Sequence, residues 1–180
     1  MKFFRFTLVA LSLLPVTARG QEPSAPMREQ ALVAQFLKTC FDTKFSSDAV
    51  IEQASAGGWK SIDPKMAPLR VKKEGGGEPP PVLSWKTDST PDAFIVFTAK
   101  TTTTVRPRDE CGVAGFDLDS KKVIDLLTTD GRFKNNNILP PGASVTMLHF
   151  DNGNLLIGRG NPSAEEKAAG HTSETVIQIL

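Results

Sequence analysis

Apolar residues recur at helical spacing in the first part of the chain. Between residues 27 and 41 they come in pairs about four positions apart, and Cys40 is one of them. This spacing predicts an amphipathic helix with Cys40 on its buried side. A second, shorter helix is predicted to begin at Asp48, a favoured N-cap residue, and to end at Gly57-Gly58, because glycine readily takes the left-handed conformation that closes a helix. We expect Trp59 to pack back across this helix end.

The middle and C-terminal parts of the chain carry short runs rich in β-branched and aromatic residues, which favour strands. The turn at residues 151–154 reads Asp-Asn-Gly-Asn, and Asn and Gly tolerate the positive φ angles of a tight hairpin. One helix is predicted to begin at Asp119 or Ser120 and to end at Gly131, and residues 163–169 are predicted to form one or two helical turns. The predicted strands are 82–87, 93–99, 111–117, 144–150, 155–158 and 172–180.

The order of these elements predicts the fold class. Two helices, a run of strands, a helix, a hairpin and a closing strand favour an α+β domain with a mostly antiparallel sheet and helices packed on one face. A parallel nucleotide-binding sheet is disfavoured, since strands and helices do not alternate regularly. The stretch EGGGEPPP at 74–81 reads as a surface loop, because neither half of the chain would have a complete core of its own. We therefore predict a single domain over 27–180, preceded by a mobile lead-in at 21–26.

The first twenty residues have the pattern of a cleavable signal peptide. Lys2 and Arg5 precede an uncharged apolar run, and small residues follow at the spacing that a signal peptidase requires. Cleavage after Ala18 and cleavage after Gly20 both fit. A transmembrane anchor would need about 20 apolar residues, roughly twice the length of this run. We therefore expect export to the periplasm or the medium, with no stable membrane insertion after cleavage.

The net charge of the chain limits the kinds of partner that it can bind. Removing residues 1–20 takes away three of the 21 basic residues, which leaves 18 against 20 acidic ones. Nucleic acid and anionic membranes both require a concentrated positive field, so this balance argues against them as partners. The expected partner is an unknown protein or a ligand of the cell envelope.

The cysteines fit export. Cys40 and Cys111 are the only two cysteines, and an even number in an oxidising compartment favours a disulfide bond. Two free buried thiols are the alternative. A metal site built on both cysteines would need further ligands, for which the chain offers only His149 and His171 as histidines.

The layout of Cys40, Gly58-Trp59, Trp85 and Cys111 behind a signal peptide resembles small uncharacterised exported proteins of proteobacteria. The resemblance covers about residues 30–127. It implies a periplasmic location and a bridge between the two cysteines, and it brings no catalytic residues with it.

Candidate chemistry is sparse. His149 and Asp151 could form a base and its orienting carboxylate, or contribute to a metal site. Both flank a hairpin turn, however, where an Asp commonly bonds its own backbone. His171 is explained by its place near a short helix end.

Asp117 and Asp119 are the second candidate pair, because two carboxylates at the end of a strand can hold a divalent cation or share acid and base roles. Asp119 is equally well explained as the cap of the following helix. The glycines at 75–77 are not followed by Lys and a helix, so they form no phosphate loop, and we predict no cofactor.

The sequence thus favours a non-enzymatic binding protein of the cell envelope. One alternative is a small hydrolase or metal-dependent enzyme that uses His149 and Asp151. Another is an enzyme inhibitor that presents a rigid loop, either 74–81 or 151–154. A catalytic His149 should lie in a cleft beside a second polar group, whereas a binding protein should expose an apolar patch.

Overall fold

The computed structural model describes most of the domain. Several predicted segments lie outside the described residues: the signal peptide (1–20), the lead-in (21–26), the loop at 74–81 and most of the polar loop before the hairpin. Among the residues described, no helix is long and apolar enough to cross a membrane. The described ranges are 28–62, 82–87, 93–100, 109–135, 145–151, 153–162 and 164–179.

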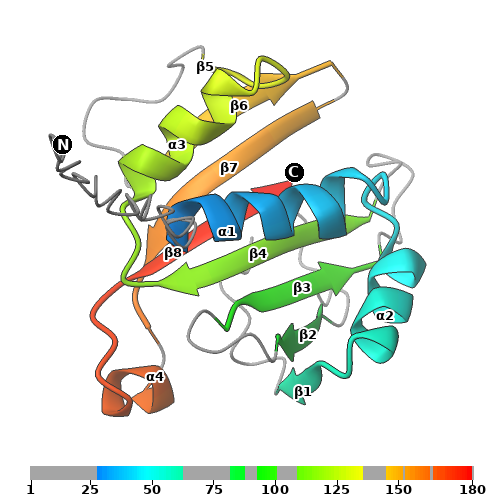
Figure 1. Cartoon of the computed structure of the whole chain (residues 1–180), viewed down its shortest axis with the longest axis vertical. Helices are drawn as coiled ribbons and strands as arrows, with labels where there is room; N and C mark the ends of the chain where they lie inside the picture. The colour runs from blue at the N-terminus through cyan, green and yellow to red at the C-terminus, as the bar shows by residue number, and fades with distance from the viewer. Residues whose placement is uncertain are drawn as a thin grey trace, which may run out of the picture.

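One antiparallel sheet organises the molecule, as predicted. Its strand order is β1-β2-β3-β4-β8-β7-β6-β5, so two four-stranded meanders meet where β4 pairs with β8 (Figure 1). Ala114 lies opposite Val176 at this junction. The strands are β1 (Lys60–Ile62), β2 (Val82–Lys86), β3 (Ile95–Ala99), β4 (Glu110–Phe116), β5 (Lys134–Asn135), β6 (Val145–Phe150), β7 (Gly153–Gly160) and β8 (Glu174–Ile179).

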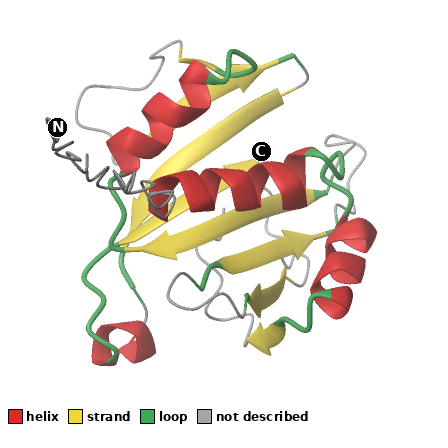
Figure 2. Ribbon diagram, viewed as in Figure 1, coloured by secondary structure: helices red, strands yellow, loops and turns green. Residues whose placement is uncertain are grey.

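Helices accompany the sheet at several places. In Figures 1 and 2, α1 and α3 cross in front of the strands, α2 lies beside the end of β3, and α4 lies apart at the lower end. The first predicted helix is α-helical at first and continues as a π-helical turn, η1. The bounds are α1 (Arg28–Phe36), η1 (Leu37–Phe41), α2 (Ser47–Ala56), α3 (Ser120–Thr129) and α4 (Ala164–Ala168).

The ends of α2 show where local chemistry was predicted well and where it was not. The cap is Ser46, whose hydroxyl accepts a hydrogen bond from the amide of Ala49, so the prediction that Asp48 is the cap was wrong. Asp48 lies in the first turn instead, where its charge suits the helix dipole. The predicted end is confirmed: Gly58 has a φ of 64°, and Trp59 donates its amide to the carbonyl of Ala54.

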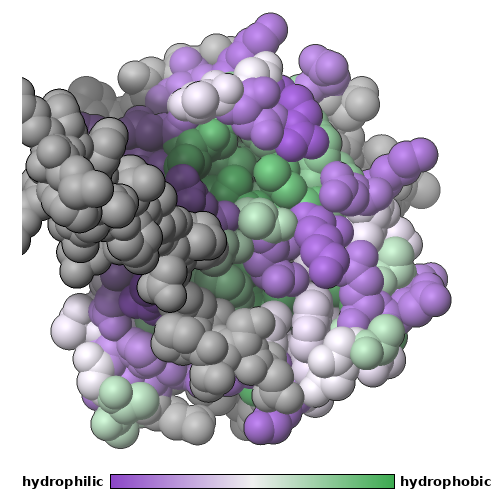
Figure 3. All heavy atoms as spheres, in the orientation of Figure 1, coloured by the Kyte–Doolittle hydropathy of each residue, from purple (hydrophilic) through white to green (hydrophobic). Residues whose placement is uncertain are grey.

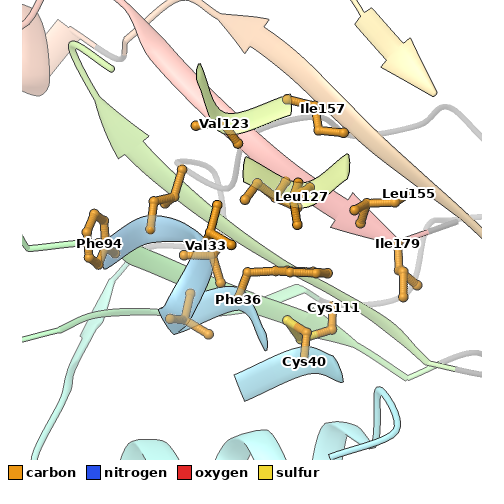
Figure 4. Close-up of a cluster of buried hydrophobic side chains, with 14 of the residues drawn as sticks. Val33, Phe36, Cys40, Phe94, Cys111, Val123, Leu127, Leu155, Ile157 and Ile179 are labelled. Atoms are coloured by element: carbon orange, nitrogen blue, oxygen red, sulfur yellow. A yellow bond between two sulfur atoms is a disulfide. The ribbon is translucent and has the colours of Figure 1, made fainter. Parts of the chain in front are cut away.

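The main core fills the space between α1, α3 and the sheet (Figure 4). Phe36 of α1 is fully buried among side chains from β7, β8 and α3. Cys40 and Cys111 are also fully buried, and their disulfide bond joins η1 to β4 with Cα atoms 5.6 Å apart. The predicted disulfide is therefore confirmed.

A second, smaller core lies on the other face of the sheet. Side chains alternate between faces along a strand, so Ile95 and Phe97 point away from Val96, which belongs to the main core. Lys86 pairs with Ile95 and shares this second face, and it reaches Glu166 of α4. The structure therefore does not show the single helix-covered face that we predicted.

The edge strands escaped prediction. β1 has three residues and β5 has two, and no strand was predicted at either place. Runs this short contain too few positions for a two-residue alternation to be recognised.

Candidate functional site

Asp117 follows β4 and ties this strand to the segment before β8. Its backbone is left-handed, with a φ of 54°, which Asp tolerates better than most residues. One carboxylate oxygen, Oδ1, accepts hydrogen bonds from the Thr172 amide (2.9 Å), the Thr172 hydroxyl (2.9 Å) and the Ser173 amide (3.2 Å). In return, the amide of Asp117 donates to the carbonyl of Ser173 at 2.9 Å.

His171 is hydrogen-bonded to the other carboxylate oxygen of Asp117. Its Nδ1 lies 2.8 Å from Oδ2 of Asp117, and its ring stacks on Phe116 with ring centroids 4.6 Å apart. The second ring nitrogen, Nε2, lies 3.8 Å from Oε2 of Glu166. The imidazole is therefore held between two carboxylates that come from different parts of the fold.

These contacts determine the charge of Asp117. The hydrogen bond from His171, followed by the backbone hydrogen bond from Thr172, holds the pKa of the Asp117 carboxyl well below its usual range. Hydrogen bonds to the ionised form favour that form. Asp117 is therefore a carboxylate at any physiological pH, and it fixes the orientation of the imidazole.

Two more carboxyl groups complete the cluster. Glu166 of α4 is buried, and its Oε1 lies 3.9 Å from Nζ of Lys86. Glu174 of β8 is also buried, and burial together with the nearby charge of Glu166 raises the pKa of Glu174 to about 7. We refer to Asp117, His171, Glu166, Glu174 and Lys86 as the acid–histidine cluster.

The cluster contains only part of an acid–base site. An imidazole oriented by a carboxylate is half of a catalytic arrangement, but a general base must also reach the proton of a nucleophile or a water molecule. Here Nε2 of His171 faces Glu166, and the Thr172 hydroxyl donates to Asp117. Within the described ranges, no group of three or more His, Cys, Asp and Glu side chains has a geometry that could hold a metal ion.

The first predicted pair is His149 with Asp151. His149 lies on β6 opposite Asn154, and its Nε2 is buried without a hydrogen-bond partner. Asp151 is exposed in the hairpin turn. The described part of the chain contains no hydrogen bond or ion pair between them, and their catalytic role stays a prediction.

The two residues of the second predicted pair, Asp117 and Asp119, have different partners. Asp119 caps α3 by accepting a hydrogen bond from the amide of Lys121 at 3.0 Å, the alternative considered from the sequence. The carboxylate of Asp117 is hydrogen-bonded to the ring of His171 instead. Their shared role as metal ligands stays a prediction.

Sequence reasoning missed the partnership of Asp117 with His171, which are 54 positions apart. The sequence signal was limited to the position of Asp117 at the end of a predicted strand, 111–117. Nothing in the spacing indicated that β8 would pair with β4 and bring His171 beside it.

A separate feature lies on the face shown in Figure 3, where apolar side chains gather in a hollow between α1 and α3. Four phenylalanines that belong to the main core or pack against it lie edge to face or tilted, with ring centroids 5.3–6.0 Å apart. The guanidinium of Arg132 lies 4.7 Å from the centroid of Phe41 and is held by Asp130. Phe41 and Phe150 are half-buried, whereas the other two are buried. This aromatic cluster comprises Phe41, Phe45, Phe133 and Phe150.

No family model, curated protein or solved structure matches the chain at a significant level.

Proposed function

We propose that this chain is a non-enzymatic, exported binding protein of the cell envelope, periplasmic or secreted, and that the hollow between α1 and α3 contributes to its ligand contact. Two observations carry the proposal: the hollow of apolar side chains (Figure 3), and the aromatic cluster, in which Phe41 and Phe150 are half-buried. Half-buried aromatic side chains offer large contact areas at little entropic cost, and an adjacent arginine adds a charged contact. In this proposal α1 and α3 cover the same face of the sheet, and the hollow lies between them.

Two further observations support the proposal. The disulfide between Cys40 and Cys111 suits an oxidising compartment. Both nitrogens of His171 face carboxylates, which is the environment of a structural histidine and weighs against a hydrolase centred on it.

A titration of the isotope-labelled chain tests the proposal by nuclear magnetic resonance. The probes are phospholipid vesicles, soluble peptidoglycan fragments and an unfolded outer-membrane polypeptide, each added separately. We expect one of them to shift the signals of Phe41, Arg132 and Phe150. Shifts confined to other regions, or no shift with any of the three, would contradict the proposal.

A matched pair of variants makes the test specific. Phe41→Ser removes a half-buried ring of the aromatic cluster and should weaken binding about tenfold, the effect of losing one good aromatic contact. Leu83→Ser removes a side chain that is 43% exposed on β2 and should leave binding unchanged. A hydrolase would instead turn over ester or amide substrates and lose that activity in His149→Ala.

A further inference from the structure

Unpartnered polar atoms gather on the second face of the sheet. In the part of the chain that the structure describes, three buried side-chain atoms have no hydrogen-bond partner: Oγ of Ser84, Nε2 of His149 and Oε1 of Gln178. The next residue along each strand belongs to the main core or packs against it, so all three side chains point to the other face. This face lies behind the strands in Figure 1. A buried polar atom without a partner is costly, so each of the three requires an explanation.

Gln178 is the most deeply buried of the three, with only 1% of its surface exposed. It lies on β8 directly between Gly112 of β4 and Leu156 of β7, well inside the sheet. Replacing an unpartnered buried polar group by an apolar group of the same shape is neutral or stabilising. The carboxamide at this position therefore does not stabilise the fold through any bond among the described residues.

The apolar neighbours of Gln178 on one side are available for contact. Leu156 lies beside it, and Met147 of β6 lies beside Leu156 on the same face. Both are half-buried, and neither of the two cores found among the described residues includes them. On the other side, Gly112 has no side chain, and the ring of Phe97 lies over it. We refer to Gln178, Leu156 and Met147 as the polar-ended strip.

The chemistry of the polar-ended strip defines its ligand. The direct cross-strand neighbours of Gln178 and Leu156 are uncharged, so an ion buried there would have no opposite charge beside it. The side-chain carboxamide of a glutamine offers an N–H donor and a carbonyl acceptor side by side, and a second primary carboxamide can pair with both at once. The half-buried apolar side chains suit a hydrocarbon body.

We propose that the polar-ended strip binds a small neutral molecule that carries a primary carboxamide on an apolar body. The carboxamide of the ligand pairs with Gln178, and its body lies over Leu156 and Met147. The site is independent of the ligand contact proposed above, because the aromatic cluster belongs to the main core, on the other face of the sheet.

A titration of the full, isotope-labelled chain with hexanamide tests the proposal by nuclear magnetic resonance. Hexanamide should shift the methyl signal of Met147 and move the side-chain amide protons of Gln178 downfield. Hexanol should bind about tenfold more weakly, because a single hydroxyl does not pair with both groups of a carboxamide. Hexanoate, with the same chain and a charge, should bind more weakly still. No shift of these signals with hexanamide, or equal binding of hexanoate, would overturn the proposal.

A substitution with two readouts separates a ligand site from a structural glutamine. Gln178→Met keeps the length of the side chain and removes the carboxamide. It should weaken hexanamide binding at least about tenfold. Without hexanamide, it should unfold at a higher urea concentration than the natural chain, because the costly group is gone. A variant that binds hexanamide as tightly as the natural chain, or that is less stable than it, would refute the site.

Two matched controls make these readouts specific. Thr98 is also fully buried, but its hydroxyl donates to the carbonyl of Glu110 at 2.7 Å, so Thr98→Val should unfold at a lower urea concentration. Ser84→Ala removes another unpartnered atom of the second face, on β2, which β3 and β4 separate from β8. This variant should bind hexanamide like the natural chain. A loss of binding as large as that of Gln178→Met would show that the effect is not local and would contradict the proposal.

Discussion

The two ends of β4 are fastened in different ways. At its start, Cys111 is bonded covalently to Cys40 inside an apolar core, where nothing titrates. After its end, Asp117 is held by hydrogen bonds to His171 and to the segment before β8. The first attachment is independent of pH and salt, whereas the second depends on which groups carry charge. We refer to the disulfide between Cys40 and Cys111 as the permanent anchor of β4, and to the hydrogen bonds of Asp117 as its conditional anchor.

The largest expected effect comes from breaking the permanent anchor. In the double variant Cys40→Ala with Cys111→Ala, the unfolded chain regains the freedom of a loop with a sequence separation of 71 residues. We expect the free energy of unfolding in urea to fall by about 4 kcal/mol. A loss below about 1 kcal/mol would show that the bridge restrains little.

The next effect comes from Glu174 of β8, which lies opposite Phe116 of β4. The folded pKa of Glu174, about 7, lies above its ordinary value of 4.5, so this stability is fully present below the lower value and is lost as pH rises toward the higher one. The loss amounts to about 3 kcal/mol. Urea unfolding at about pH 5 and pH 8 should show it, and Glu174→Gln should be the more stable chain at pH 8. Equal stability of the two chains at pH 8 would contradict this expectation.

A smaller effect of opposite sign should appear at Asp117. Its folded pKa is depressed, so its contribution is present above its ordinary value of 3.8 and is lost as pH falls below it. Asp117→Asn should cost about 1 kcal/mol at neutral pH, since the group is partly exposed and solvent screens it. Urea unfolding measures the loss, and Asp125→Asn, at an exposed position on α3, serves as the control. A loss that persists unchanged below about pH 3 would exclude the charge as its cause.

The smallest effect lies near the permanent anchor. Ser46→Ala removes the cap of α2 and should cost about 0.5 kcal/mol of unfolding free energy, because the capping hydrogen bond is exposed. Its effect should be equal at about pH 5 and pH 8, because no titrating group is lost. Asp48→Ala should cost less, since its ion pair with Lys100 is exposed. The reverse order would restore Asp48 as the residue that matters at this helix start.

Apart from β1 and β5, the helices and strands were predictable from the sequence because they depend on local patterns. The disulfide was predictable because the chain has two cysteines and the signal-peptide pattern suggests an oxidising compartment. Helical spacing placed α1 and the buried side of Cys40, and the Asp-Asn-Gly-Asn turn placed the hairpin of β6 and β7. The cap of α2 was misplaced by two residues because Ser and Asp both suit that position. The local signals did not indicate which strands would meet.

The candidate site depends on which strands pair with each other, and the sequence did not indicate that pairing. Asp117 and His171 become neighbours only because β8 returns beside β4. Neighbours in sequence, such as Asp117 and Asp119, suggested pairs that the fold separates, since Asp119 caps α3. Glu174 was overlooked because a carboxyl group in a strand normally faces water, and only the register places it over Gly160.

The outermost strands of the sheet, β1 and β5, have a consequence beyond the fold of one molecule. They have three and two residues, so the rims of the sheet within the described part of the chain offer little backbone to a passing strand. Long exposed edge strands are where copies of a protein can pair and form fibres. Edge strands as short as β1 and β5 leave few unpaired backbone groups with which a strand of a second copy could pair.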